Sequence, residues 1–164
     1  MKNYIIKDLL QEITASLDPF IPRAQREAQL LLMAHLNVDE LWLMTNKNLH
    51  VENLDGLLEW VKRRTKNEPL EYITNSVSFY SEEFYIDEGA LIPRPETELL
   101  IDEVLKRVTC RDDEMTFVEV GVGSGIISIM LAKHLPNTKF IAVDISERAL
   151  DVARKNIEKF GMEN

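Results

Sequence analysis

The sequence Phe117-Val-Glu-Val-Gly-Val-Gly-Ser-Gly-Ile126 joins a run of β-branched and aromatic residues to three glycines at alternate positions. An apolar run of helical character follows from Ile126 to Leu135. This order predicts a short strand over 116–120, then a glycine turn and a helix. Glycine takes positive φ and lets a ligand approach bare backbone, and a helix N-terminus adds free N–H groups and a partial positive charge. The segment therefore predicts a ligand-binding turn at the start of a helix.

A second apolar run, Lys139 to Val143, ends at Asp144, nineteen residues after Gly125. An acidic residue about 20 residues after a glycine turn, at the tip of the next strand, is placed to accept hydrogen bonds from a ribose diol. We interpret the whole unit as strand, glycine loop, helix, strand and acid, which is half of a nucleotide-binding α/β sheet.

The glycine spacing indicates which nucleotide to expect. The dinucleotide fingerprint is G-x-G-x-x-G, whereas the spacing here is G-x-G-x-G, with Glu119 two residues before Gly121. This E-x-G-x-G-x-G pattern resembles the first motif of S-adenosylmethionine (SAM) methyltransferases. SAM carries no phosphate, its positive amino group suits carbonyls and a nearby carboxylate, and its ribose suits Asp144. An ordinary tight strand–helix turn and a dinucleotide site are the alternatives. SAM is favoured because the glycine spacing, Glu119 and Asp144 all fit a SAM site.

Composition narrows the class of protein. The chain has 164 residues, enough for one domain or two small ones, and a net charge of −9. Nucleic-acid-binding proteins usually carry a basic stripe, so DNA or RNA is a poor candidate substrate. The single cysteine, Cys110, allows no internal disulfide, which suits a reducing compartment. With no long apolar stretch and no signal peptide, we expect a soluble cytoplasmic protein without membrane contact.

Residues 1–70 are predicted to form a helical bundle. Apolar residues recur with helical periodicity over the segments 4–17, 23–36, 39–46 and 51–66. We expect Asp39 to cap the third helix, with Trp42 buried. The residues expected to face inward from the fourth helix are Leu54, Leu57, Leu58 and Val61. His35 is interpreted as a helix-end residue, because no second metal-binding side chain lies near it, and no metal site is predicted. Nothing in the bundle resembles a catalytic site, which suggests a recognition role.

Residues 71–92 are predicted to be a β-hairpin that links two domains. Aromatic and β-branched residues alternate over Tyr72–Thr74, Val77–Tyr80 and Glu83–Ile86, with a polar turn near Ser81-Glu82.

Residues 93–164 are predicted to be the cofactor-binding domain. Two prolines hold Arg94 in a rigid extended loop, and Pro95 is expected to open a helix with Glu96 in its first turn. Arg94 is thereby placed to line the mouth of the cofactor pocket, although a rigid linker is the simpler interpretation. The last helix is expected to start after Ser146, an N-cap, and to end at Gly161.

Several motifs together resemble the HemK/PrmC family, methyltransferases that modify the glutamine of the Gly-Gly-Gln motif in bacterial peptide-chain release factors. The matching segments, in order, are "EPLEYITNSVSFYSEEFYID", "LIPRPETELL", "VEVGVGSGIISIMLAKHLP" and "IAVDISERALDVARKN". The resemblance implies an α/β protein: a helical N-terminal bundle, a hairpin linker, and the first half of a class I (Rossmann-like) SAM methyltransferase domain. It implies a bundle that contacts the release factor.

The same resemblance assigns the cofactor residues. The loop residues Gly121, Val122, Gly123, Ser124 and Gly125 would wrap the methionine part of SAM. Asp144 would hold the ribose, Glu119 would support the loop and the amino end, and the segment from Arg94 to Glu96 would help close the pocket.

The sequence departs from the family pattern in three places. Asn75-Ser76 stands where the family usually has Gly-Glu, and Val122 replaces the more usual threonine of the loop. The substrate motif Asn-Pro-Pro-Tyr is absent, so no catalytic residue is predicted and we expect this chain to be inactive. It is interpreted as the N-terminal part of a longer protein. Because a half-sheet leaves an unpaired edge and an uncovered apolar face, self-association is expected, which a monomer mass in light scattering would contradict.

Two other functions stay open at this point. An adenine-specific DNA methyltransferase shares the Asn-Pro-Pro-Tyr chemistry, but the negative charge argues against it; methyl transfer to DNA rather than to protein would support it. A non-catalytic SAM- or partner-binding module is favoured by the missing motif. Methyl transfer by a full-length product would reject that interpretation.

Overall fold

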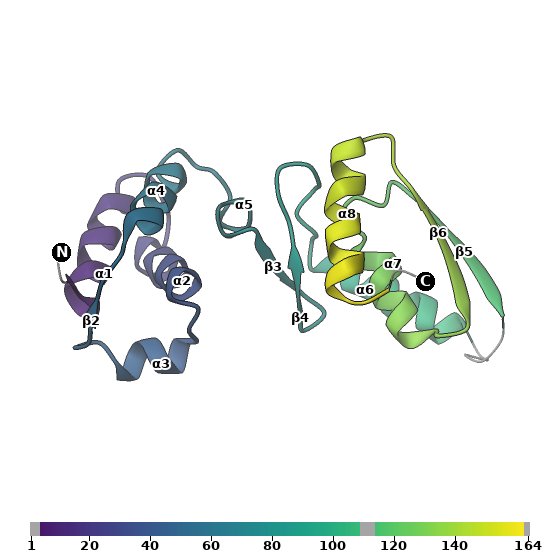
Figure 1. The fold of residues 1–164 in the computed structure, drawn as a ribbon, viewed down its shortest axis with the longest axis horizontal. Helices are drawn as coiled ribbons and strands as arrows, with labels where there is room; N and C mark the ends of the chain where they lie inside the picture. The colour runs from purple at the N-terminus through teal and green to yellow at the C-terminus, as the bar shows by residue number, and fades with distance from the viewer. Residues whose placement is uncertain (1–3, 109–113, 163–164) are drawn as a thin grey trace. The chain divides into compact units, whose positions relative to one another are not determined.

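The chain forms two compact units, residues 1–74 and 75–164. The computed structural model describes residues 4–108 and 114–162 (Figure 1), so Cys110 lies outside the described residues. Each unit has its own core and is described by itself.

The first unit is helical. Its helices are α1 (Ile6–Leu17), α2 (Ala24–Leu36), α3 (Glu40–Thr45), α4 (Asp55–Arg64) and α5 (Leu70–Thr74). Two short strands, β1 (Tyr4–Ile5) and β2 (His50–Val51), pair antiparallel. The Asp39 side chain accepts a 2.7 Å hydrogen bond from Trp42 N, which confirms the predicted cap of α3.

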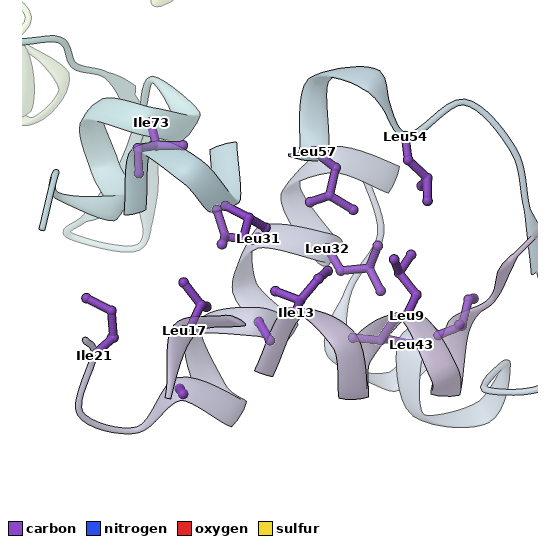
Figure 2. Packing of buried hydrophobic residues seen from close by; sticks show 14 residues of the cluster. Leu9, Ile13, Leu17, Ile21, Leu31, Leu32, Leu43, Leu54, Leu57 and Ile73 are labelled. Carbon is purple, nitrogen blue, oxygen red and sulfur yellow. The ribbon is translucent and has the colours of Figure 1, made fainter. Parts of the chain in front are cut away.

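The core of this unit is built from apolar residues at helical spacing. Leu9, Ile13 and Leu17 lie on one face of α1 and meet Leu31 and Leu32 of α2 (Figure 2). Residues from the other helices that complete the cluster include Leu43, Leu57 and Ile73. The four-residue spacing on α1 puts these side chains on one stripe, which explains why the periodicity predicted the bundle.

The first residues of the predicted helices 4–17 and 51–66 belong instead to β1 and β2. Three further local predictions in this unit are wrong. Leu58 is 57% exposed, because it lies about 100° further round α4 than Leu57, beyond the contact with α1 and α2. Leu43 rather than Trp42 is the fully buried residue of α3, and Trp42 is half-buried. Tyr72–Thr74 is part of helix α5 rather than of a strand, since Ile73 fits the helical core and its N–H bonds to Pro69 O at 3.1 Å.

The second unit combines helices with two small sheets. The hairpin strands are β3 (Ser76–Phe79) and β4 (Glu82–Tyr85), followed by α6 (Glu96–Arg107). The remaining elements are β5 (Met115–Val120), α7 (Ile126–His134), β6 (Thr138–Val143) and α8 (Glu147–Lys159). β5 and β6 pair in parallel with α7 between them in sequence, as predicted for half of a Rossmann-like sheet.

The predicted hairpin is present, with its turn one residue earlier than expected. Tyr80 and Ser81 form the two-residue turn with φ of 53° and 63°, the left-handed conformation that suits a tight hairpin. Helix α6 holds this turn: Glu98 Oε1 accepts from Tyr80 N at 2.8 Å, and Asp102 Oδ1 accepts from the Tyr80 hydroxyl at 2.6 Å. Phe84 of β4 packs against Phe160, with ring centroids 4.6 Å apart and the ring planes tilted by 37°. These hydrogen bonds and this ring contact attach the hairpin to the helical part of the second unit.

The sheet of β5 and β6 has two unlike faces. Phe117 and Phe140 stack on the face that α6 and α7 cover, with centroids 5.5 Å apart. The large apolar residues left exposed by these strands and the loop after β6 are Val118, Val120, Ile141, Val143 and Ile145. Figure 1 shows α6, α7 and α8 on one side of the two strands. Self-association through this exposed apolar face stays a prediction.

Among residues 4–108 and 114–162, no helix is long and apolar enough to cross a membrane.

Candidate functional site

The glycine loop closes over the end of strand β6. Gly121, Gly123 and Gly125 all have positive φ, at 79°, 55° and 79°. The N–H groups of Gly121 and Val122 both donate to Val143 O, at 2.8 and 3.0 Å. The turn thus sits at the carboxyl ends of two parallel strands, where ligands bind in open α/β sheets.

Asp144 fastens this loop to the start of α8. Its Oδ2 accepts from Gly123 N at 3.0 Å, and its Oδ1 accepts from Ser146 N at 2.9 Å. The hydrogen bonds from these backbone N–H groups hold the pKa of Asp144 below its ordinary value, and the bond from Ser146 has the largest effect. Each carboxylate oxygen keeps lone pairs beyond these two bonds, so the ionised group is able to accept from a ligand hydroxyl as well.

Glu119 links β5 to the first turn of α7. Its Oε2 accepts from Ser128 N at 3.1 Å and also from the Ser128 hydroxyl. Burial raises the pKa of Glu119 above its ordinary value, although the bonds from Ser128 act in the opposite direction. A cavity of about 330 Å³ lies beside it, and its lining includes Leu100, Val104, Phe117, Gly121 and Ile127.

The remaining predicted residues divide into two groups. Val122 and Ser124 are buried, 5% and 6% exposed, so their side chains serve the packing of the loop. Arg94 and Glu96 are exposed at the start of α6, where Arg94 O accepts from Thr97 N at 2.9 Å. In the described part of the chain, no hydrogen bond or ion pair joins them to the glycine loop or to Asp144. Their role in closing a pocket stays a prediction.

Comparison with known proteins bears on both units. Residues 8–74 match the family model of the PrmC N-terminal domain, and residues 111–164 match that of a methyltransferase domain. The chain is 41% identical to a release factor glutamine methyltransferase of Koribacter versatilis over 137 residues, covering 82% of the chain and 49% of that relative. A protein of the same description from Dictyoglomus turgidum is 43% identical over 133 residues, 81% of the chain and 47% of the relative. A bifunctional methyltransferase of Rickettsia typhi is 35% identical, over 95% of the chain and 34% of the relative.

The chain belongs to the HemK/PrmC family. The two family models fall one in each unit, and the methyltransferase model includes the glycine loop and Asp144. The second unit is accordingly the beginning of a Rossmann-like class I methyltransferase fold. The chain spans about half the length of the release factor glutamine methyltransferases that it matches.

Two residues that contact the glycine loop or the strand before it were not predicted from the sequence. The sequence does not indicate that Ser128 binds Glu119, because Ser128 is a small residue within an apolar helix. The position of Asn156 could have been recognised, because it continues the buried stripe of α8 formed by Ala149, Val152 and Ala153. A polar residue at such a position needs a hydrogen-bond partner. Asn156 is fully buried.

The raised pKa of Glu119 predicts a pH-dependent stability. Such a carboxyl group stabilises the fold fully below its unfolded pKa, about 4.3, and this contribution is lost as pH rises through the higher folded pKa. Glu119→Gln should therefore be more stable than the wild type at pH 7, with the difference shrinking toward pH 4. Urea unfolding followed by circular dichroism at several pH values measures it. The exposed Glu114→Gln is the control and should stay within about 0.5 kcal/mol; a pH-independent effect of Glu119→Gln would contradict the assignment.

Proposed function

We propose that this chain is the cofactor-binding portion of a SAM-dependent methyltransferase that modifies the side-chain amide of the Gly-Gly-Gln glutamine in peptide-chain release factors. The observation that carries the cofactor assignment is the junction of the glycine loop with Asp144 at the carboxyl ends of β5 and β6. The substrate assignment draws on the relatives described as release factor glutamine methyltransferases.

The residues around this junction fit SAM. The glycine loop offers close approach to backbone atoms, Asp144 offers carboxylate oxygens to the ribose diol, and the carboxylate of Glu119 lies on the adjoining strand. Arg94 and Glu96 are proposed to close the pocket over its opening. SAM would supply an activated methyl group, and the chain's own residues would bind SAM and orient it.

No catalytic residue is proposed in this chain. The sequence contains no Asn-Pro dipeptide, and the family motif that positions the target amide is absent with it. We expect the 164 residues to bind SAM without transferring its methyl group.

The helical unit is proposed to contact the release factor. It carries a cavity of about 580 Å³ between α1 and α2, whose lining includes Lys7, Gln11, Thr14, Gln25 and Gln29. Self-association of the chain with a second copy also stays a prediction. The exposed Val and Ile side chains on β5 and β6 support it, and light scattering measures it.

Calorimetric titration of SAM into the 164-residue chain tests the cofactor assignment. We expect saturable binding that Asp144→Ala weakens at least about tenfold, because a hydrogen bond to a charged group contributes about 1.5–3 kcal/mol. Asp151→Ala is the matched control, since that carboxylate lies on the surface of α8 and pairs with Arg154 at 2.7 Å. Absence of heat with a folded chain, or equal affinities of the wild type and Asp144→Ala, would contradict the proposal.

A further inference from the structure

Asn156 carries a buried amide on helix α8 of the second unit. It has no exposed surface and lies on the face of α8 that also buries Ala149, Val152 and Ala153. Placing an amide among apolar side chains is unfavourable unless hydrogen bonds replace those to water. The contacts of Asn156 therefore indicate why the residue is there.

Asn156 bonds to two segments that are far apart in the sequence. Its Oδ1 accepts from Tyr85 N at 2.7 Å, and its Nδ2 donates to Tyr85 O at 2.9 Å. The second N–H of Nδ2 donates to Ser124 O at 2.8 Å. The opposite amide orientation would set two donors, the side-chain NH₂ and Tyr85 N, against each other, so the network selects this one. The amide thus joins the end of the hairpin to the glycine loop.

The contact with Ser124 bears directly on the shape of the loop. Ser124 is buried, so without Asn156 its carbonyl would lose its partner or rotate toward water, and rotation would also redirect the N–H of Gly125. One turn earlier on the same helix, Ala153 lies so close that a Cβ on Gly125 would come within 3.3 Å of its Cβ. Two residues of α8 therefore act on neighbouring residues of the loop. Ala153 limits how closely Gly125 approaches the helix, and Asn156 determines the orientation of the peptide between Ser124 and Gly125.

The hairpin end is held by the same helix. Lys155 Nζ donates to the Tyr85 hydroxyl at 2.9 Å and lies 4.2 Å from the centre of its ring. Main chain and side chain of Tyr85 are both attached to α8, so displacement of the hairpin would be transmitted through Asn156 to the loop.

We propose that Asn156 is a positioning residue, which presets the glycine loop for its ligand by binding it to the hairpin without touching the ligand itself. The identity of the ligand as SAM rests on the proposed function. The positioning role does not, because it is a property of the ligand-free chain.

Two measurements on the folded chain test this inference. In Asn156→Ala, hydrogen exchange followed by mass spectrometry should become at least tenfold faster in the loop, residues 121–126, and at the Tyr85 end of the hairpin. SAM affinity should fall at least tenfold in the titration described above. Val152→Ala is the control for lost stability, since Val152 is buried on the same helix and contributes no side-chain hydrogen bond. Tyr85→Phe keeps both main-chain bonds to Asn156 and should leave loop exchange unchanged.

The outcomes separate this inference from the proposed function. If exchange in the loop of Asn156→Ala matches that of Val152→Ala, the positioning role is overturned. If loop exchange rises but the wild type binds no SAM, the positioning role holds and the cofactor assignment fails. Should Asn156→Ala not fold, Asn156→Asp decides: its ionised form has no N–H for Ser124 O, so unchanged loop exchange overturns the inference and faster exchange supports it.

Discussion

Gly125→Ala is expected to destabilise the second unit by about 2–3 kcal/mol and to weaken SAM binding. Gly125 has φ of 79°, where a Cβ adds about 1–2 kcal/mol of steric strain. The new Cβ would also lie 3.3 Å from the Cβ of Ala153 and 3.4 Å from Cδ1 of Ile129, so the loop would move away from α8. Scanning calorimetry and the SAM titration measure the two effects.

Gly121 separates the backbone effect from the contact effect. It has the same φ, 79°, but nothing lies within 4 Å of an added Cβ. Gly121→Ala should therefore lose only about 1–2 kcal/mol. Combining Gly125→Ala with Ala153→Gly should recover part of the difference, although glycine inside α8 itself costs about 1 kcal/mol. Equal destabilisation by Gly121→Ala and Gly125→Ala would show that the close approach to Ala153 does not matter.

Leu57→Ala should lower the free energy of unfolding of the helical unit by about 2–5 kcal/mol, the range for removing a fully buried leucine side chain. The adjacent Leu58→Ala should change it by less than about 1 kcal/mol, because Leu58 is 57% exposed on the same helix. Both tryptophans of the chain, Trp42 and Trp60, lie in this unit, so their fluorescence in a urea titration reports on it. Similar losses for the two variants would contradict the observed packing of α4.

The elements around the candidate site were predictable because each depends on a short run of residues. The apolar run before the glycines, the glycines themselves and the helix after them predicted β5, the loop and α7. Ser146 was predicted to cap α8, and its Oγ accepts from Ala149 N at 3.3 Å. Such signals require only the residue's own conformational preference or a partner within one helical turn.

Side-chain burial was less predictable, because it depends on how the helices pack. The apolar spacing of α4 does not distinguish Leu57 from Leu58, and only contact with α1 and α2 selects the buried one. Tyr72–Thr74 has residues typical of a strand, yet the helical core takes up Ile73 and makes the segment helical. Tertiary packing overrides local preference in such short segments.

The sequence alone determined the family, the order of most elements and the expectation that the glycine loop and Asp144 lie together. These follow from glycine conformation, from periodicity and from motifs whose residues are close in the chain. Only the tertiary structure showed that Asn156 bonds Tyr85, 71 residues away, and Ser124, 32 residues away. It also showed that the Asp144 carboxylate already holds Gly123 N. The physical reason is that a buried polar group is satisfied by whichever partners the packing of the helices and strands brings to it, and no local pattern encodes that choice.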